Sequence, residues 1–336
     1  MGPSVVHERF FAFGRQFMAF ADPPHHTQLK SLFVQGFTRV RAQRYLPTMR
    51  AIVEEVVDEI IDWGSADIIE DFARKVPLKI ISTLLGVPRS DQEALRVWID
   101  DYHPVIGFPP MTPAQTAKAN SASDGMAEYF RRVVAERERA PGDDLISELL
   151  EVNRSLEQPL DEHAIIANLF LLYHAAQDTQ KYQVGNTLVA LHRHPEHLAY
   201  IQDDPQRCWE CLDEFMRYDS SSQIVARVAM TDIEVHGTAI AEGQTVLLGI
   251  AAANHDPAVF PEPERFDLKR PEARLQIAFG GGPHTCLGNG VARLAIPLML
   301  EVLLTRIPSL RIEFGGLVQA KTLSKRGFMS IPATWS

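Results

Sequence analysis

Cysteine is scarce in this sequence, and long apolar runs are lacking. Only three cysteines occur in 336 residues, Cys208, Cys211 and Cys286, so no disulfide framework is expected and a reducing cytoplasm fits best. The most apolar long segment, residues 164–176, is interrupted by polar side chains and falls short of a membrane span. The N-terminal residues show no signal-peptide pattern. We therefore expect a soluble cytoplasmic protein without a membrane partner.

Positive charge is also in deficit. The chain has 43 acidic and 33 basic residues, which gives a formal net charge of −10. A negative surface argues against nucleic acid or an anionic membrane as a partner. With 46% hydrophobic residues the chain can bury a large core, and it has no internal repeat or low-complexity linker. We expect one large domain over residues 1–336.

The periodicity of the sequence indicates a mostly α fold with a small β portion. Residues 161–194 contain no proline and keep a helical pattern, which predicts a long central helix of roughly 50 Å. Residues 223–250 alternate apolar and polar positions, as short strands do, and residues 254–285 are irregular. A loop is expected at 102–113. Further helices are expected within 27–62, 66–86, 114–139 and 205–218, and from Cys286 to about Thr305.

The segment from Phe279 to Gly288, FGGGPHTCLG, carries the clearest chemical signal. Its glycines let the backbone turn tightly and approach a flat partner. Cys286 stands at the start of a predicted helix, where the helix dipole and free amides favour a thiolate, either a metal ligand or a nucleophile. A single thiolate does not make a zinc or iron–sulfur site, whereas a haem needs only one. Cys208 and Cys211 lie in a predicted helix without a second pair and are interpreted as core residues.

Glycine and cysteine content alone favours a structural loop, but the full spacing favours a haem site. The segment resembles the haem-binding loop of the cytochrome P-450 family, whose pattern is F-x-x-G-x-[RH]-x-C-x-G. The resemblance implies that Cys286 ligates the iron of haem b and that His284 reaches a propionate. It also implies that Phe279 packs beside the sulfur, and that Gly280 and Gly288 border the cofactor.

A second motif follows the same resemblance. Glu214 and Arg217 give the family's E-x-x-R, and Arg265 falls in a Pro-Glu-Arg-Phe segment that looks like its second-arginine motif. Alone, a Glu and an Arg three residues apart on a helix are usually a solvated pair. The resemblance implies a buried ionic triad of these three residues that fixes the loop before the cysteine.

Basic residues elsewhere match the family's propionate ligands. Residues 22–27 read Asp-Pro-Pro-His-His-Thr, which is similar to the family's D-P-P-x-H-T and places His26 on a propionate. Arg227 matches a propionate arginine. Lys30 stands where the family usually has arginine, so it keeps the positive charge but loses the bidentate fork.

The long helix carries a variant of the family's A-G-x-[DE]-T-T pattern. Asp178 and Thr179 keep the acid and the alcohol, whereas Ala176 and Gln180 replace the glycine and the last threonine. The resemblance implies that Ala175 lies against the haem, that the helix opens locally, and that the acid–alcohol pair relays protons. The competing interpretation is that both are ordinary helix residues.

The resemblance covers the chain from about residue 20 to its end and implies a cytochrome P-450-like domain. Several dozen residues that family members carry before the D-P-P-x-H motif are missing here, so an incomplete pocket wall is expected. The substrate pocket would be lined by a mixed polar and apolar set: His174, Gln223, Ile224, Val225 and Phe328.

Three functions remain open. The first is a haem-thiolate monooxygenase of natural-product (secondary) metabolism that acts on a small-molecule or carrier-bound substrate. Its electrons would come from NAD(P)H through a ferredoxin and a ferredoxin reductase. The second is a haem-thiolate enzyme of oxidative coupling or cyclisation, which the changes at Ala176 and Gln180 motivate. The third is a non-catalytic haem- or carrier-binding module, which the short N-terminus motivates.

Overall fold

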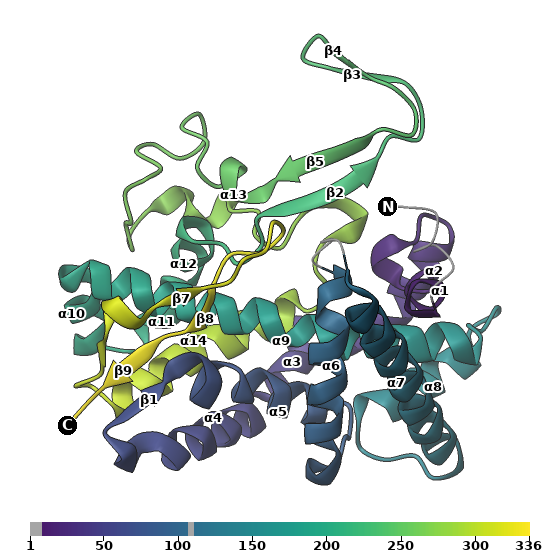
Figure 1. Cartoon of the computed structure of the whole chain (residues 1–336), viewed down its shortest axis with the longest axis horizontal. Coiled ribbons are helices and arrows are strands. Elements are labelled where there is room, and N and C mark those ends of the chain that lie inside the picture. The colour runs from purple at the N-terminus through teal and green to yellow at the C-terminus, as the bar shows by residue number, and fades with distance from the viewer. Residues whose placement is uncertain (1–8, 107–110) are drawn as a thin grey trace.

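Helices form most of the computed structural model, which describes residues 9–106 and 111–336 (Figure 1). The α-helices are α1 (Arg9–Gly14), α2 (His25–Val34), α3 (Arg39–Arg44), α4 (Leu46–Ile60), α5 (Lys75–Leu84), α6 (Gln92–Ile106), α7 (Pro113–Arg139), α8 (Leu145–Ser155), α9 (Glu162–Arg193), α10 (Pro195–Asp203), α11 (Arg207–Glu210), α12 (Leu212–Tyr218), α13 (Ile250–Ala253) and α14 (Asn289–Arg306). In the described residues, no helix is long and apolar enough to cross a membrane.

The strands are short and form small antiparallel sheets. They are β1 (Ser65–Asp67), β2 (Ile224–Val228), β3 (Ile233–Val235), β4 (Thr238–Ile240), β5 (Thr245–Gly249), β6 (Arg311–Ile312), β7 (Val318–Gln319), β8 (Phe328–Ser330) and β9 (Pro332–Thr334). The C-terminal β9 lies between β1 and β6, while β2 pairs with β5, β3 with β4 and β7 with β8. The last strand therefore joins residues 65–67 to the C-terminal part of the chain.

Helix α9 runs through the middle of the helical body (Figure 1). Asp161 caps its first turn by accepting a hydrogen bond from the amide of Ala164 at 2.7 Å, and Pro195 opens the next helix. All residues from Gln180 to Leu191 are buried, because α5, α7, α14 and the π-helix η5 (Ile68–Ala73) pack around the helix. The predicted central helix of residues 161–194 is therefore confirmed.

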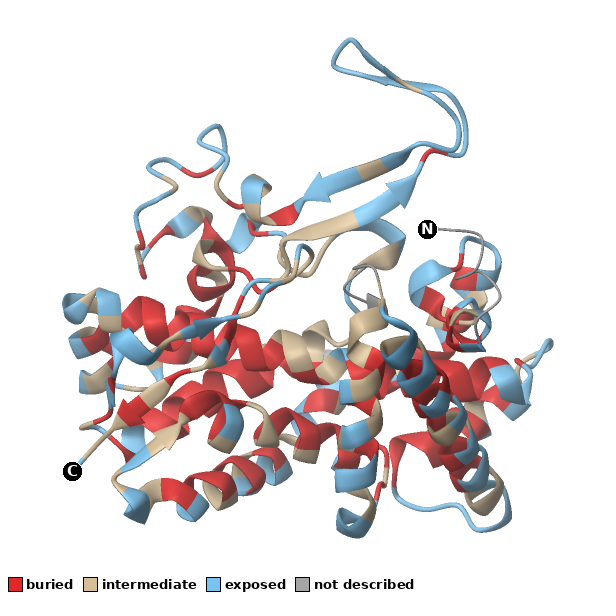
Figure 2. Ribbon diagram, in the orientation of Figure 1, coloured by how far each residue is buried: buried red, intermediate tan, exposed pale blue. Residues whose placement is uncertain are grey.

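The hairpin of β3 and β4 is the most exposed part of the described chain. Val235 pairs with Thr238, so the turn consists of His236 and Gly237, whose φ angles of 48° and 78° both lie in the left-handed region. The hairpin stands away from the helical body, and its residues are almost all exposed (Figures 1 and 2). It adds little to the core.

Two segments depart from the expected pattern. The predicted loop at 102–113 is wrong in its first part, because α6 continues to Ile106 with Pro104 inside it; residues 107–110 lie outside those described. The two short helices expected over 66–86 are present as the π-helix η5 and α5, but the strand β1, which was not expected, precedes them. Pairing of β1 with β9 explains this change, since a partner more than 260 residues away leaves no local signal.

A buried ionic network on α12 organises the irregular stretch before the cysteine. The Arg217 guanidinium is fully buried and donates through Nε and Nη2 to the Glu214 carboxylate at 2.7 and 2.9 Å. Its Nη1 also donates to the carbonyls of Asn254 and Pro263, each at 2.9 Å. These bonds satisfy backbone groups that would otherwise be buried without partners.

Arg265 was predicted as the third member of this network, and that prediction is wrong. Its side chain is 63% exposed and pairs with Glu262 and Asp267 on the surface. Arg270 takes its place, with Nε 3.5 Å from the Glu214 carboxylate and its guanidinium bonded to the carbonyls of Glu262 and Arg265. Arg265 therefore contributes its backbone carbonyl and not its charge.

Candidate haem-thiolate site

The cysteine loop has the tight geometry that its glycines predicted. Gly280 and Gly282 have φ angles of 69° and 67°, which side chains rarely adopt. The amide of Cys286 donates to the Phe279 carbonyl at 2.9 Å and closes the loop. Backbone N–H groups of Gly288 and Asn289, at the start of α14, act on the Cys286 thiol and lower its pKa. The loop therefore directs two amide donors at one sulfur.

The Cys286 thiol is set apart from the other two cysteines by its accessibility. Cys286 is exposed, whereas Cys208 and Cys211 are buried. The protein around Cys286 nevertheless raises the pKa of its thiol by desolvation, and the two amides oppose that rise. Burial raises the pKa of Cys211 to about 11 and that of Cys208 further, so both remain thiols. The Cys286 thiol is therefore accessible although the surrounding protein desolvates it.

The four basic residues that were predicted to bind propionates lie on or near this loop. The rings of His26 and His284 lie 4.2 Å apart, and Lys30 donates to the carbonyls of Pro283 and Thr285. Desolvation lowers the pKa of His284, and the nearby charges of His26 and Arg227 lower it further. These side chains come from α2, β2 and the cysteine loop, so segments far apart in the sequence form a basic cluster. Lys30 and Arg227 carry its positive charge, while lowered pKa values favour neutral His26 and His284.

The middle of α9 also has a reachable face. Ala175 is exposed although His174 beside it is buried. The Thr179 hydroxyl donates to the Ala175 carbonyl at 3.1 Å, as a threonine in mid-helix can do. The helix itself is continuous from Glu162 to Arg193, so the local opening that the resemblance implied is not present. Alanine at 176 in place of glycine favours this unbroken helix.

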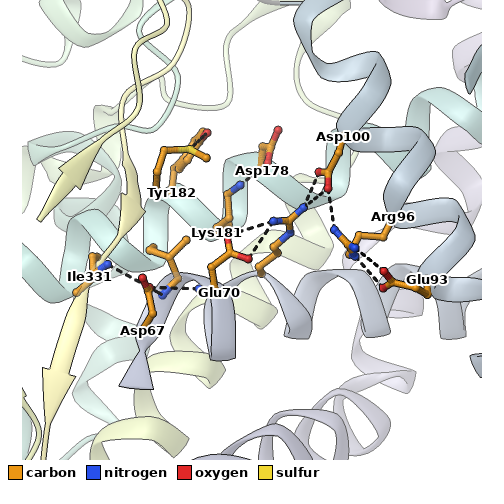
Figure 3. A network of polar contacts seen from close by, with 12 residues as sticks. Asp67, Glu70, Glu93, Arg96, Asp100, Asp178, Lys181, Tyr182 and Ile331 are labelled. Atoms are coloured by element: carbon orange, nitrogen blue, oxygen red, sulfur yellow. Dashed lines mark hydrogen bonds and ion pairs between the residues drawn. The ribbon is translucent and has the colours of Figure 1, made fainter. Parts of the chain in front are cut away.

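Asp178 forms two close ion-pair contacts. Its Oδ2 lies 2.7 Å from His103 Nδ1, and its Oδ1 lies 2.7 Å from Lys181 Nζ. Burial raises the pKa of the carboxyl, but His103 and Lys181 outweigh that effect and hold it well below its usual range. Figure 3 shows Asp178 and Lys181 beside the surface network that contains Asp100. Asp178 is therefore an ionised carboxylate.

His174 is a second polar group on this face of α9. The residue is 5% exposed, and its Nε2 has no hydrogen-bond partner among the described residues. Burial lowers its pKa to about 4, an effect that outweighs the attraction of Asp178. Its ring is stacked on that of His103, with 6.2 Å between centroids. His174 is thus neutral at physiological pH.

The other predicted pocket residues divide into two groups. Ile224 and Val225 are half-buried at the start of β2, and the Gln223 amide donates to the Ser324 carbonyl at 2.9 Å. Phe328 is 4% exposed and belongs to the main apolar core. The turn between β7 and β8 therefore lies against the segment that leads into β2.

Three charged residues of this region were missed from the sequence. The contact of Lys181 with Asp178 could have been predicted from the sequence, because residues three positions apart on a helix lie side by side. His103 had no such local signal, since it was assigned to a loop. Lys325 also had none: its charge acts on Asp178 and Cys286, but it lies far from both in sequence.

These residues fit a haem. The chain offers one exposed thiol beside backbone amides, a basic cluster for two propionates, and the exposed Ala175 on α9. A single cysteine ligand suits a cofactor that brings four nitrogen ligands of its own. In the described residues, no group of three or more His, Cys, Asp and Glu side chains could hold a metal ion. A small cavity of about 10 Å³, lined by Tyr45, Met49 and Ile80 among others, is far too small for a cofactor.

A mostly helical body with one cysteine on a glycine-rich loop defines a haem-thiolate oxidoreductase. The cytochrome P450 family model matches residues 2–308. The chain belongs to the cytochrome P450 family, and the predicted fold class is confirmed. It is a monooxygenase of the cytochrome P450 type, and the family and fold imply haem b held through a cysteine.

Three relatives illustrate the match. The biotin biosynthesis cytochrome P450 of Bacillus subtilis is 33% identical over 88% of this chain and 74% of its own length. The 6-deoxyerythronolide B hydroxylase of Saccharopolyspora erythraea is 32% identical over 94% of this chain and 77% of its own. The crystal structure of P450BioI with an acyl carrier protein ligated to hexadec-9Z-enoic acid has a TM-score of 0.93 and 29% identity, covering 100% of this chain and 86% of that one.

Proposed function

We propose that Cys286 is the cysteine that holds the haem iron in a monooxygenase of natural-product biosynthesis. The observation that carries this assignment is that Cys286 alone of the three cysteines is exposed and faces two backbone amide donors. The buried Cys208 and Cys211 have no comparable environment. Relatives named for biotin biosynthesis and for macrolide-precursor hydroxylation support a biosynthetic role.

The basic cluster would bind the cofactor's edge. His26, Lys30, Arg227 and His284 would hold the two propionates, because Lys30 and Arg227 attract carboxylates and the two imidazoles can donate hydrogen bonds to them. A Cβ at Gly288 would lie 3.9 Å from the Cys286 Sγ, so this glycine borders the sulfur, and Phe279 would pack next to it.

Residues of α9 would transfer protons to the site. When bound, a thiolate-ligated haem supplies the activation of dioxygen. Asp178 is ionised and can accept a proton, and His103, which is 31% exposed, connects it with the solvent side. We assign His103 to proton entry, Asp178 to transfer, and the Thr179 hydroxyl to delivery at the exposed face beside Ala175.

Electrons would come from NAD(P)H through a ferredoxin and its reductase, which are the usual donors of bacterial members of the family. A small-molecule or carrier-bound substrate is compatible with the relatives. The P450BioI structure contains an acyl carrier protein, but that partner is a property of that protein.

The reduced, carbon monoxide-bound absorption spectrum tests the ligand. The wild-type protein is expected to show the strongly red-shifted Soret band of thiolate-ligated haem. Cys286→Ser should lose that band, because a hydroxyl does not replace the thiolate. Cys211→Ser is the control and should retain it. Retention of the band in Cys286→Ser, with an unchanged circular dichroism spectrum, would refute the assignment.

Oxidative coupling without oxygen insertion is the second candidate. The unbroken α9 and the pairing of Asp178 with two basic side chains favour it, because both restrict proton delivery. Labelled dioxygen separates the two functions: label in the product identifies a monooxygenase, and its absence with complete turnover identifies coupling or cyclisation. A substrate-induced spectral change without turnover would instead identify a non-catalytic module.

A further inference from the structure

Asp213 lies next to Glu214 on α12 and has partners that lead to the cysteine loop. Its Oδ1 lies 2.8 Å from Arg293 Nη2 on α14 and accepts a hydrogen bond from Gln276 Nε2 at 3.1 Å. The Oε1 atom of Gln276 in turn accepts a hydrogen bond from the amide of Ala278 at 2.7 Å. One carboxylate therefore joins α12 both to the N-terminal part of α14 and to the chain that enters the loop.

Arg293 contacts the cysteine loop at both of its ends. Its guanidinium carbon lies 5.4 Å from the centre of the Phe279 ring, and its Nε donates to Asn289 Oδ1 at 2.9 Å. Phe279 accepts a hydrogen bond from the Cys286 amide at 2.9 Å, and the Asn289 amide donates to the Cys286 carbonyl at 3.4 Å. A single guanidinium thus contacts the two residues that hydrogen-bond to the backbone of Cys286.

The orientation of this guanidinium is fixed. Arginine presents its donors in a rigid planar fork, whereas lysine carries a point charge on a flexible stem. Because Nη2 is held by Asp213 and Nε by Asn289, the contact of the cation with the Phe279 ring is set at the same time. The Arg293 and Asp213 side chains are 37% and 29% exposed, so water screens their charges only in part.

Both charges lie where they can act on an iron held by Cys286. Uptake of one electron by a thiolate-ligated haem adds one negative charge at the site. A nearby cation favours that uptake and a nearby anion opposes it, since the potential of such a centre depends on the charges and hydrogen bonds around it. The proposed ferredoxin supplies the electron, and no bond is formed or broken in this step.

We propose that Asp213 and Arg293 are positioning residues that set the reduction potential of the haem iron through the cysteine loop. The proposal rests on the proposed haem site. The cation of Arg293 makes the iron easier to reduce, and the carboxylate of Asp213 moderates that effect while it orients the guanidinium. Removal of either charge therefore shifts the potential, and the two shifts have opposite signs. A pair that only stabilises the fold has no reason to produce such opposite shifts.

A potentiometric titration of the haem-bound protein, followed through the Soret band, measures the potential. The variants are Arg293→Met, Arg293→Lys and Asp213→Asn. The matched controls are Arg306→Met and Asp58→Asn, because Arg306 lies at the other end of α14 and pairs with Asp58 at 2.6 Å on the surface.

At a fixed ambient potential, Arg293→Met should lower the ratio of reduced to oxidised protein about threefold, and Asp213→Asn should raise it about threefold. Since a tenfold change corresponds to about 59 mV for one electron, each shift is about 28 mV. Arg293→Lys keeps the charge and should shift the potential less than Arg293→Met. Arg306→Met and Asp58→Asn should match the wild type.

Shifts of the same sign in Arg293→Met and Asp213→Asn, or shifts no larger than those of the controls, would overturn the proposal. A shift in Arg293→Lys as large as that in Arg293→Met would also overturn it. If Arg293→Met does not retain haem, the sign in Asp213→Asn decides: a higher potential supports the proposal, and any other result overturns it. A wild-type protein without the red-shifted carbon monoxide band would instead refute the haem site itself.

Discussion

Two buried clusters of charge each place one carboxylate between two basic side chains: the structural cluster of Glu214, Arg217 and Arg270, and the site cluster of Asp178, His103 and Lys181. In the structural cluster the guanidinium groups also donate to the backbone carbonyls of the irregular stretch that precedes the cysteine. In the site cluster the carboxylate is the main partner, His103 is partly exposed, and His174 Nε2 nearby has no partner.

The two clusters distinguish charged residues that stabilise the fold from charged residues that remain available to a ligand or a proton. Where nearly all donors end on backbone carbonyls, the cluster fixes the chain and leaves nothing for a ligand. Where hydrogen-bond donors and charges remain unpaired, they are available to bind a ligand or to exchange a proton. The two clusters should therefore respond differently to mutation.

The largest effect is expected in the structural cluster. Arg217→Leu should lower the free energy of unfolding by about 4 kcal/mol, because it leaves the buried Glu214 with Arg270 as its only basic partner among the described residues and removes donors from three backbone carbonyls. Urea denaturation followed by circular dichroism measures the change. Arg265→Leu is the matched control and should alter stability by less than about 0.5 kcal/mol, since its side chain is on the surface. A loss below about 1 kcal/mol for Arg217→Leu would contradict the role assigned to the cluster.

In the site cluster, Asp178→Asn should lower the rate of turnover more than it lowers the stability of the fold. We expect oxygen-dependent turnover to fall by about 100-fold, because the amide cannot transfer the proton. The rate of NADPH oxidation with a surrogate ferredoxin and reductase measures it, and Asp58→Asn on the exposed surface is the control. An unchanged rate in Asp178→Asn would show that protons reach the site by another route.

The smallest effect concerns acid stability. His174 has a folded pKa of about 4, below its ordinary value of 6.5, so the unfolded chain binds a proton first as pH falls. Stability is therefore lost from pH 6.5 down to 4, and this residue should account for about 2 kcal/mol of loss between pH 7 and 5. His174→Phe should escape that part of the loss, whereas the exposed His25→Phe should not. Equal pH dependence of wild type and His174→Phe in urea denaturation would exclude a buried neutral histidine.

The features that were predicted correctly from the sequence depend on capping and turn residues that lie close together in the chain. The ends of α9 were predicted to within about one residue, because Asp161 caps the helix and Pro195 begins the next one. The glycines of the cysteine loop likewise occupy the left-handed conformations that their sequence indicated. Such features depend on neighbours a few positions away.

The features that could not be predicted from the sequence depend on contacts between residues far apart in the chain. Arg265 and Arg270 lie five positions apart in an irregular segment, and only the folded backbone decides which guanidinium turns inward to Glu214. His103 reaches Asp178 because α6 continues past Pro104. Lys325 depends on a turn whose partner segment begins about 100 residues earlier in the chain. The sequence spacing between these interacting residues does not follow the period of a helix or a strand, so it gives no local signal.

The hairpin of β3 and β4 offers a practical handle for engineering. A Cβ added at Gly237 would meet no atom within 4 Å, and the turn stands clear of the core. A peptide tag, a fluorophore or a tethered electron-donor protein could be inserted there while the helical body and the cysteine loop stay unchanged. The same turn would let the molecule be immobilised in one orientation on an electrode.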